Sequence, residues 1–148
     1  MEHDYPTILS AADYARLQGL MCTMIGARTP LASLVRRKLG SAVVTPARNI
    51  ASTTATGGRR VRFRIDGGET EERVLTWSPL KREDGRSLSL LVPRGLALLG
   101  LCAEEAIAYQ TASGRTEFIE IDTVVDDAAA VVPLAAPVQA EAALAGVR

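Results

Sequence analysis

The chain has few of the side chains that most metal sites and nucleophilic enzymes require. Its 148 residues include one histidine, His3, and two cysteines, Cys22 and Cys102. A histidine metal site or a Cys–His catalytic pair is therefore not expected. Both cysteines have apolar neighbours in the sequence, and we interpret them as small core residues rather than as a disulfide or redox pair.

Aromatic residues and long apolar runs are also scarce. The chain has three Tyr, two Phe and one Trp, so the core must be aliphatic. No uncharged apolar run is long enough to predict a membrane span. The first residues, MEHDYP, lack the basic segment of a signal peptide. We therefore expect a cytoplasmic protein with reduced thiols.

The common phosphate, dinucleotide, serine-hydrolase and Cys-x-x-Cys motifs are missing from the sequence. The adjacent acidic pairs include Glu71-Glu72, Glu104-Glu105 and Asp126-Asp127. Adjacent side chains point apart on a strand or helix, so each pair is interpreted as solvated surface. We expect no cofactor, no metal and no enzymatic activity.

What the chain does have is 47% apolar residues, enough for a core. Charge is uneven: the first 60 residues carry 8 Lys+Arg against 3 Asp+Glu, and the remainder 9 against 14. Such asymmetry suggests two modules with different surfaces. It does not identify what either module contacts.

The first forty residues have the pattern of two short helices. After Pro6–Leu9, Ser10 is a helix N-cap, an apolar face follows at helical spacing, and Gly26 ends the helix. Thr29-Pro30 starts a second helix that Gly40 closes. Two helices joined by so short a loop are expected to pack as an antiparallel hairpin.

A polar linker follows over residues 41–58, with a possible short strand at Asn49–Ser52. Period-two patterns then predict strands. They lie at Arg60–Ile65, Glu71–Trp77, Ser87–Val92, Ala106–Thr111 and Thr116–Val125, with a polar loop at Lys81–Gly85.

The stretch Ser87–Leu101 runs from a strand through Pro93-Arg94-Gly95, interpreted as a corner, into a short helix at Leu96–Leu99. About five strands and one inserted helix give an α+β fold class. Residues 128–148, rich in Ala, Val and Pro, are expected to be a disordered tail.

Two basic groups could contact phosphates or acidic proteins. One comprises Arg59, Arg60, Arg62 and Arg64; the other comprises Arg36, Arg37 and Lys38. For the first we favour an exposed strand face paired with Glu117 and Glu120 of a neighbouring strand. For the second, contact with nucleic acid is the weaker interpretation, because no aromatic residue lies nearby. Trp77 is interpreted as core.

The stretch PRGLALLGL, residues 93–101, resembles the P-(apolar)-G-x-A-L-(I/L)-G segment of the bacterial transcript-cleavage (Gre) factors. It is most similar to the branch called regulator of nucleoside diphosphate kinase, or Rnk. The flanking PTIL, VRFRIDGGETEERVLTW, SLSLLVP and TEFIEIDTV segments match in order, so that the resemblance covers roughly residues 6–126.

The resemblance implies a helical hairpin over residues 1–45 and an FKBP-like α+β domain over residues 46–127. In that family the C-terminal domain docks on RNA polymerase near the channel through which nucleotides enter, and the hairpin projects toward the channel. We therefore expect polymerase docking at Val92, Pro93, Arg94, Gly95, Leu98 and Leu99, with Pro93 and Arg94 as an exposed corner. The hairpin tip is expected at Met24, Ile25, Gly26, Ala27, Arg28 and Thr29. Contact with nucleic acid would be indirect, no membrane is involved, and a monomer is expected.

Cleavage factors of this family hold a catalytic magnesium ion with acidic residues at the hairpin tip, as a hard cation requires. The loop Cys22–Thr29 has no Asp or Glu, so we expect polymerase binding without stimulation of transcript cleavage. Arg94 also replaces a usually aliphatic residue of the family, and Glu104-Glu105 replaces its Gly-Asp.

Two other interpretations remain open at this point. An FKBP-like fold could indicate a peptidyl-prolyl isomerase, although the chain has few aromatic residues for such a pocket. The name of the Rnk branch could also indicate an indirect effector of nucleoside diphosphate kinase, although no residue pattern indicates contact with the kinase.

Overall fold

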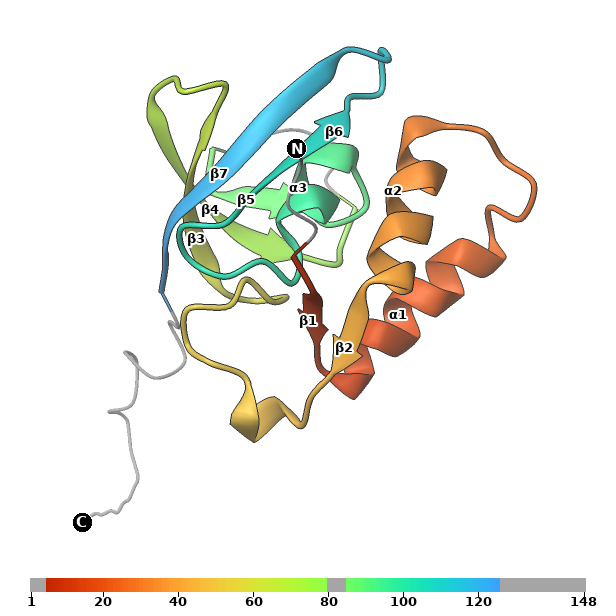
Figure 1. The fold of residues 1–148 in the computed structure, drawn as a ribbon, viewed down its shortest axis with the longest axis horizontal. Helices are drawn as coiled ribbons and strands as arrows, with labels where there is room; N and C mark the ends of the chain where they lie inside the picture. Colours follow the sequence, from red (N-terminus) through yellow and green to blue (C-terminus); the bar gives the residue numbers. More distant parts are fainter. Residues whose placement is uncertain (1–4, 80–84, 126–148) are drawn as a thin grey trace.

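A computed structural model describes residues 5–79 and 85–125 (Figure 1). The predicted tail, His3 and most of the predicted Lys81–Gly85 loop lie outside the described residues. The fold is α+β, as expected. No helix of the described residues is long and apolar enough to cross a membrane.

The N-terminal part is a β-α-α-β unit. Strand β1 (Thr7–Leu9) leads into helices α1 (Ala11–Cys22) and α2 (Pro30–Gly40), and β2 (Ala42–Val44) pairs with β1 in parallel. The side chains of Ser10 and Thr29 each accept a hydrogen bond from the backbone N–H of the third helical residue, as the cap signals predicted. Helix α1 ends at Cys22, earlier than predicted, and Gly26 lies in the turn beyond it.

The segment predicted as a linker contains more structure than expected. Its first residues form β2, which the sequence analysis missed. The short strand predicted at Asn49–Ser52 is wrong, because the 3-10 helix η1 (Ala47–Asn49) covers its first residue and a bend and a turn follow. Pro46 fixes the backbone at the start of that turn and has no N–H to offer a ladder.

The rest of the described chain forms a five-stranded sheet in the order β5-β4-β3-β7-β6. Its strands are β3 (Arg60–Ile65), β4 (Thr70–Thr76), β5 (Ser87–Ser89), β6 (Ala106–Gln110) and β7 (Thr116–Val125). Pairing is antiparallel except between β4 and β5, and a register shift interrupts β3–β7 between Arg62 and Phe63. The sheet curls around α3 (Pro93–Leu98), as Figure 1 shows.

Helix α3 joins the two parts of the chain. It contacts β5, β6 and β7 on one side and α2 on the other. One buried cluster includes Leu17 and Leu34 from the helical pair, Leu96 and Leu98 from α3, and Phe63 from the sheet. The boundary expected near residue 46 therefore does not separate two hydrophobic cores.

Both cysteine interpretations need correction. Cys22 is exposed at the last residue of α1, and Cys102 is half-buried beside the Thr54 hydroxyl, with 3.3 Å between Oγ1 and Sγ. The apolar neighbours of Cys22 did not predict its burial because only one face of α1 packs inward. Trp77 packs partly buried against the core, and its Nε1 donates to Asp13 Oδ1 at 2.9 Å.

Candidate functional site

The residues predicted to dock a partner lie at the start of α3. Pro93 is in the first turn, where a missing N–H costs no hydrogen bond. Val92 precedes the helix as its N-cap residue without a side-chain cap, and 41% of its surface is exposed. Pro93 and Arg94 are half-buried. These three residues form the accessible part of the predicted site.

The other three predicted residues are buried. Gly95, Leu98 and Leu99 belong to α3 or its cap and face the interior. Gly95 lies inside the helix, not at a corner before it, because α3 begins at Pro93. A Cβ added at Gly95 would stand 2.0 Å from the backbone oxygen of Ser89. The close approach at Gly95 fixes α3 against β5, and none of the three buried residues can contact a partner directly.

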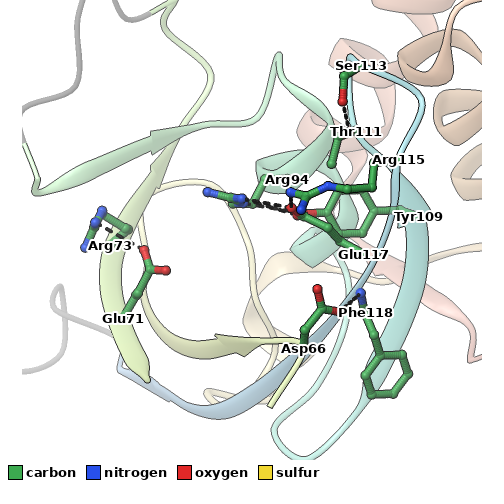
Figure 2. A network of polar contacts seen from close by, with 10 residues as sticks. All are labelled: Asp66, Glu71, Arg73, Arg94, Tyr109, Thr111, Ser113, Arg115, Glu117 and Phe118. Atoms are coloured by element: carbon green, nitrogen blue, oxygen red, sulfur yellow. Dashed lines mark hydrogen bonds and ion pairs between the residues drawn. The ribbon is translucent and has the colours of Figure 1, made fainter. Parts of the chain in front are cut away.

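Arg94 is not the free polar corner that the sequence predicted. Its Nη2 lies 3.2 Å from Glu117 Oε1, and its Nε donates to the Tyr109 hydroxyl at 3.4 Å (Figure 2). Tyr109 donates to the same carboxylate, which Arg115 also contacts. Glu117 is only 2% exposed, so this carboxylate is a buried anion that fixes three side chains.

The network shifts the pKa values of its members. Burial alone would raise the pKa of Glu117, but the hydrogen bonds from Tyr109 and Arg94 and the nearby guanidinium charges hold it below its usual value. Burial, together with the bond to Glu117, raises the pKa of Tyr109 to about 12. At neutral pH the carboxylate is therefore charged and the phenol is protonated.

Arg94 also lines a hollow between α3 and the sheet, which we call the α3 groove. It has a volume of about 370 Å³. Val92 lines the groove at the start of α3. On the side of the sheet it is lined by Phe63 of β3, Arg73 of β4 and Ser89 of β5. Arg73 pairs with Glu71 at 3.2 Å on the wall opposite Arg94, so both walls carry a guanidinium (Figure 2).

Sequence reasoning missed Glu117 as a structural residue. We expected it on the exposed face of its strand, paired with the arginines of the neighbouring strand. Instead Glu117 is buried and Phe118 is 49% exposed. The alternation of the strand could have shown this. Side chains two residues apart share one face of a strand, so Glu117 lies on the same face as Ile119 and Ile121, and that face is buried.

The loop predicted as the hairpin tip joins the two helices of the N-terminal part. Residues 23–29 connect α1 to α2, with Ile25 80% exposed and Met24 packed against the core. Arg36 donates to the Ala27 carbonyl and so braces the loop. Within residues 5–79 and 85–125, no cluster of three His, Cys, Asp or Glu side chains could hold a metal ion.

The basic groups are engaged within the fold. Arg60 and Arg62 pair with Glu72, and Arg64 pairs with Glu120 and Asp122. The expected pairing with Glu117 is wrong, because that residue faces the other side of the sheet.

In the second group Lys38 is buried, and its Nζ donates to the carbonyls of Ala97 and Leu99 at 2.8 Å each. The group is therefore not a continuous exposed basic patch. The sequence could not show this burial, because the acceptors lie about sixty residues away in α3 and its cap.

Comparison with known proteins gives relatives by sequence and by structure. No protein-family model matches the chain. The regulator of nucleoside diphosphate kinase from Escherichia coli K12 is 27% identical over 118 residues, which is 78% of this chain and 87% of that protein. The Shigella flexneri protein of the same name matches to the same extent.

Among solved structures, the transcription elongation factor GreA/GreB from Nitrosomonas europaea has a similar fold. The TM-score is 0.63 at 27% sequence identity, and the match covers 82% of this chain and 99% of that one. A mixed α+β chain with a curled sheet is thus common to both proteins. By sequence the chain is similar to the proteins named regulator of nucleoside diphosphate kinase, and by fold it is similar to a GreA/GreB transcription elongation factor, which together support the Rnk branch of the Gre-factor family as its place.

Proposed function

We propose that the chain is a non-enzymatic transcription regulator that binds RNA polymerase near the channel through which nucleotides enter. The observation that carries this proposal is the match to a solved transcription elongation factor over nearly all of that factor's length. In this proposal residues 46–127 correspond to the FKBP-like docking domain of Gre factors, and α1 and α2 correspond to a shortened hairpin. The protein acts as a cytoplasmic monomer, and its contact with nucleic acid is indirect.

The docking surface is the rim of the α3 groove at Val92, Pro93 and Arg94. The exposed apolar side chain of Val92 stands beside a guanidinium whose position Glu117 and Tyr109 fix. A preorganised guanidinium loses little conformational entropy when a partner carboxylate or carbonyl binds. The groove itself gives that partner a recess between α3 and β4.

Cleavage stimulation is not part of the proposed function. A magnesium-binding tip needs carboxylates, and residues 23–29 contain Arg28 as their one charged residue. Helices of 12 and 11 residues reach only about 18 Å along their axes. The tip therefore modulates the channel by occupying space rather than by supplying a metal ligand.

The test uses the full chain and purified RNA polymerase from the same organism. Saturable binding, with no stimulation of RNA cleavage in backtracked complexes, is the expected pair of results. Absence of binding would refute the proposal. Cleavage at the level of an acidic-tip factor would refute the assignment of the tip.

Peptidyl-prolyl isomerisation is not supported by the groove. Among its described lining residues only Phe63 is aromatic, and the guanidiniums of Arg73 and Arg94 place positive charge on its walls. The relatives found by sequence are named regulators of nucleoside diphosphate kinase. We propose that any such effect of this chain is indirect, so that the purified chain leaves the activity of the purified kinase unchanged.

A further inference from the structure

A second cavity lies where the helical pair meets the sheet, on residues that the proposed docking surface does not use. Its volume is about 410 Å³, within the range of roughly 300–1,000 Å³ typical of small-molecule sites. We call it the junction cavity. Its wall includes Tyr5 and Thr7 near β1, Arg37 and Lys38 of α2, Ser41, and Ile107 of β6.

The charges around this cavity are of one sign. Arg37 and Lys38 line it, and none of the described residues on its wall is acidic. The carboxylate of Glu105 acts electrostatically on Lys38, but it accepts a hydrogen bond from the backbone N–H of Cys102 at 2.9 Å and does not line the cavity. The cavity therefore has a positive potential without a counter-ion of its own among the described residues.

Lys38 is unusual because its ammonium is buried without a salt bridge among the described residues. Its two acceptors, the carbonyls of Ala97 and Leu99, are neutral. Burial, aided by the charge of Arg37, lowers the pKa of Lys38 to about 7. Burial disfavours the charged form of Lys38. An anion in the adjoining cavity would stabilise that charged ammonium.

The remaining donors suit a tetrahedral oxyanion. Arg37 uses Nη1 for the Ala108 carbonyl at 2.9 Å, and a guanidinium has five N–H donors in a planar fork. The hydroxyls of Thr7 and Ser41 also line the cavity, but they bond to each other at 2.7 Å and the Ser41 hydroxyl donates to the Arg37 carbonyl, so the guanidinium supplies the hydrogen bonds for a ligand. Ile107 and Leu101 supply apolar surface for an attached organic group.

We propose that the junction cavity binds a small molecule carrying a phosphate group, with the phosphate held at Arg37 and Lys38. The bound molecule contacts α2, β1 and β6 together, because those elements share the cavity wall. Binding therefore also clamps the helical pair to the sheet. Free phosphate and an organic phosphate share this chemistry, and the probes separate the two.

The test is calorimetric titration of the full chain at pH 7 and constant ionic strength, with inorganic phosphate and AMP as probes. Phosphate stabilises most proteins by exclusion from their surface, so a rise in Tm alone is not evidence of a site. R37Q removes the guanidinium fork, whereas R36Q changes the neighbouring Arg36, which braces the tip loop and does not line the cavity.

The expected result is saturable binding of at least one probe, weakened about tenfold or more in R37Q, as the loss of a charge-assisted hydrogen bond predicts, and unchanged in R36Q. Tighter binding of AMP would identify the ligand of the junction cavity as an organic phosphate. Tighter binding of inorganic phosphate would identify it as the free ion. No saturable binding of either probe, or equal affinity in R37Q, overturns the proposal.

A further variant tests whether the chain supplies its own counter-ion. Glu2 and Asp4 precede Tyr5 in the sequence and lie outside the described residues. If the double variant E2Q/D4N binds phosphate and the wild-type chain does not, an N-terminal carboxylate occupies the site and the proposal is wrong. Equal binding by both chains supports an external phosphate.

Discussion

Two buried charged residues, Glu117 and Lys38, each connect elements that are distant in the sequence. Glu117 on β7 holds Arg94 of α3 and Tyr109 of β6. Lys38 of α2 holds the carbonyls at the end of α3. Because each is almost fully removed from water, losing its partners costs more than losing a surface pair.

Glu117→Gln should lower the free energy of unfolding by about 2 kcal/mol, because two guanidiniums lose a buried anionic partner. Urea unfolding at pH 7 measures the change. Glu120→Gln is the matched control on the same strand, since its pair with Arg64 is exposed and should contribute less than about 1 kcal/mol. Equal effects of the two substitutions would contradict the structural role of Glu117.

The same carboxylate predicts a loss of stability in acid. The pKa of Glu117 is lower in the folded chain than in the unfolded chain. The unfolded state therefore binds more protons in acid, and the stabilisation is present above the usual pKa of 4.5 and lost as pH falls through the folded pKa. Wild-type stability should fall more steeply than that of E117Q below that pH. Parallel urea titrations at several acidic pH values compare the slopes.

Lys38 predicts a second pH dependence, from neutral to alkaline pH. Its pKa falls from 10.5 to about 7 on folding, so the unfolded chain binds more protons between these values and stability rises with pH. In chloride buffer without phosphate, the gain from pH 7 to 9.5 should be on the order of 1–3 kcal/mol. Lys38→Met should remove this gain, which urea unfolding across that pH range measures. An unchanged pH dependence in K38M would contradict the account of the buried ammonium.

At the scale of elements, α3 is placed by a close approach to β5. The prediction concerns Gly95, where an added Cβ would meet the Ser89 backbone oxygen. Gly95→Ala should destabilise the chain by about 2 kcal/mol or more, because backbone must move to admit the methyl group. Gly19→Ala in α1 is the control: nothing lies within 4 Å of its added Cβ, and a gain of about 0.5–1 kcal/mol is expected. Thermal unfolding of both variants provides the comparison.

Local patterns predicted most elements because each signal lies within a few residues. Caps at Ser10 and Thr29 and the alternation in β3 and β7 are of this kind. Strand β2 was missed because its pairing to β1 depends on residues 35 positions away. The burial of Lys38 and the Arg94–Glu117 pair were missed for the same reason, so the sequence did not show which residues of the candidate site are accessible.

At the scale of the whole molecule, the helical pair and the sheet share one core through α3. The tip loop and the rim of the α3 groove are therefore held in a defined relation to each other. In the proposed function this relation lets docking at the groove direct the tip toward the polymerase channel. Arg94→Glu is a poor probe of docking, because it would place a second carboxylate beside Glu117 and disturb the fold.

Val92→Asp is the better probe of docking, because the Val92 side chain is 41% exposed and the substitution should not disturb the fold. The matched control is Val44→Asp on β2, a valine that is 50% exposed and lies outside the proposed docking surface. The decisive measurement is the affinity of the full chain for purified RNA polymerase in wild type and both variants. The account predicts saturable wild-type binding, at least about tenfold weaker in V92D and unchanged in V44D. No binding by the wild-type chain, or equal binding by V92D, would contradict it.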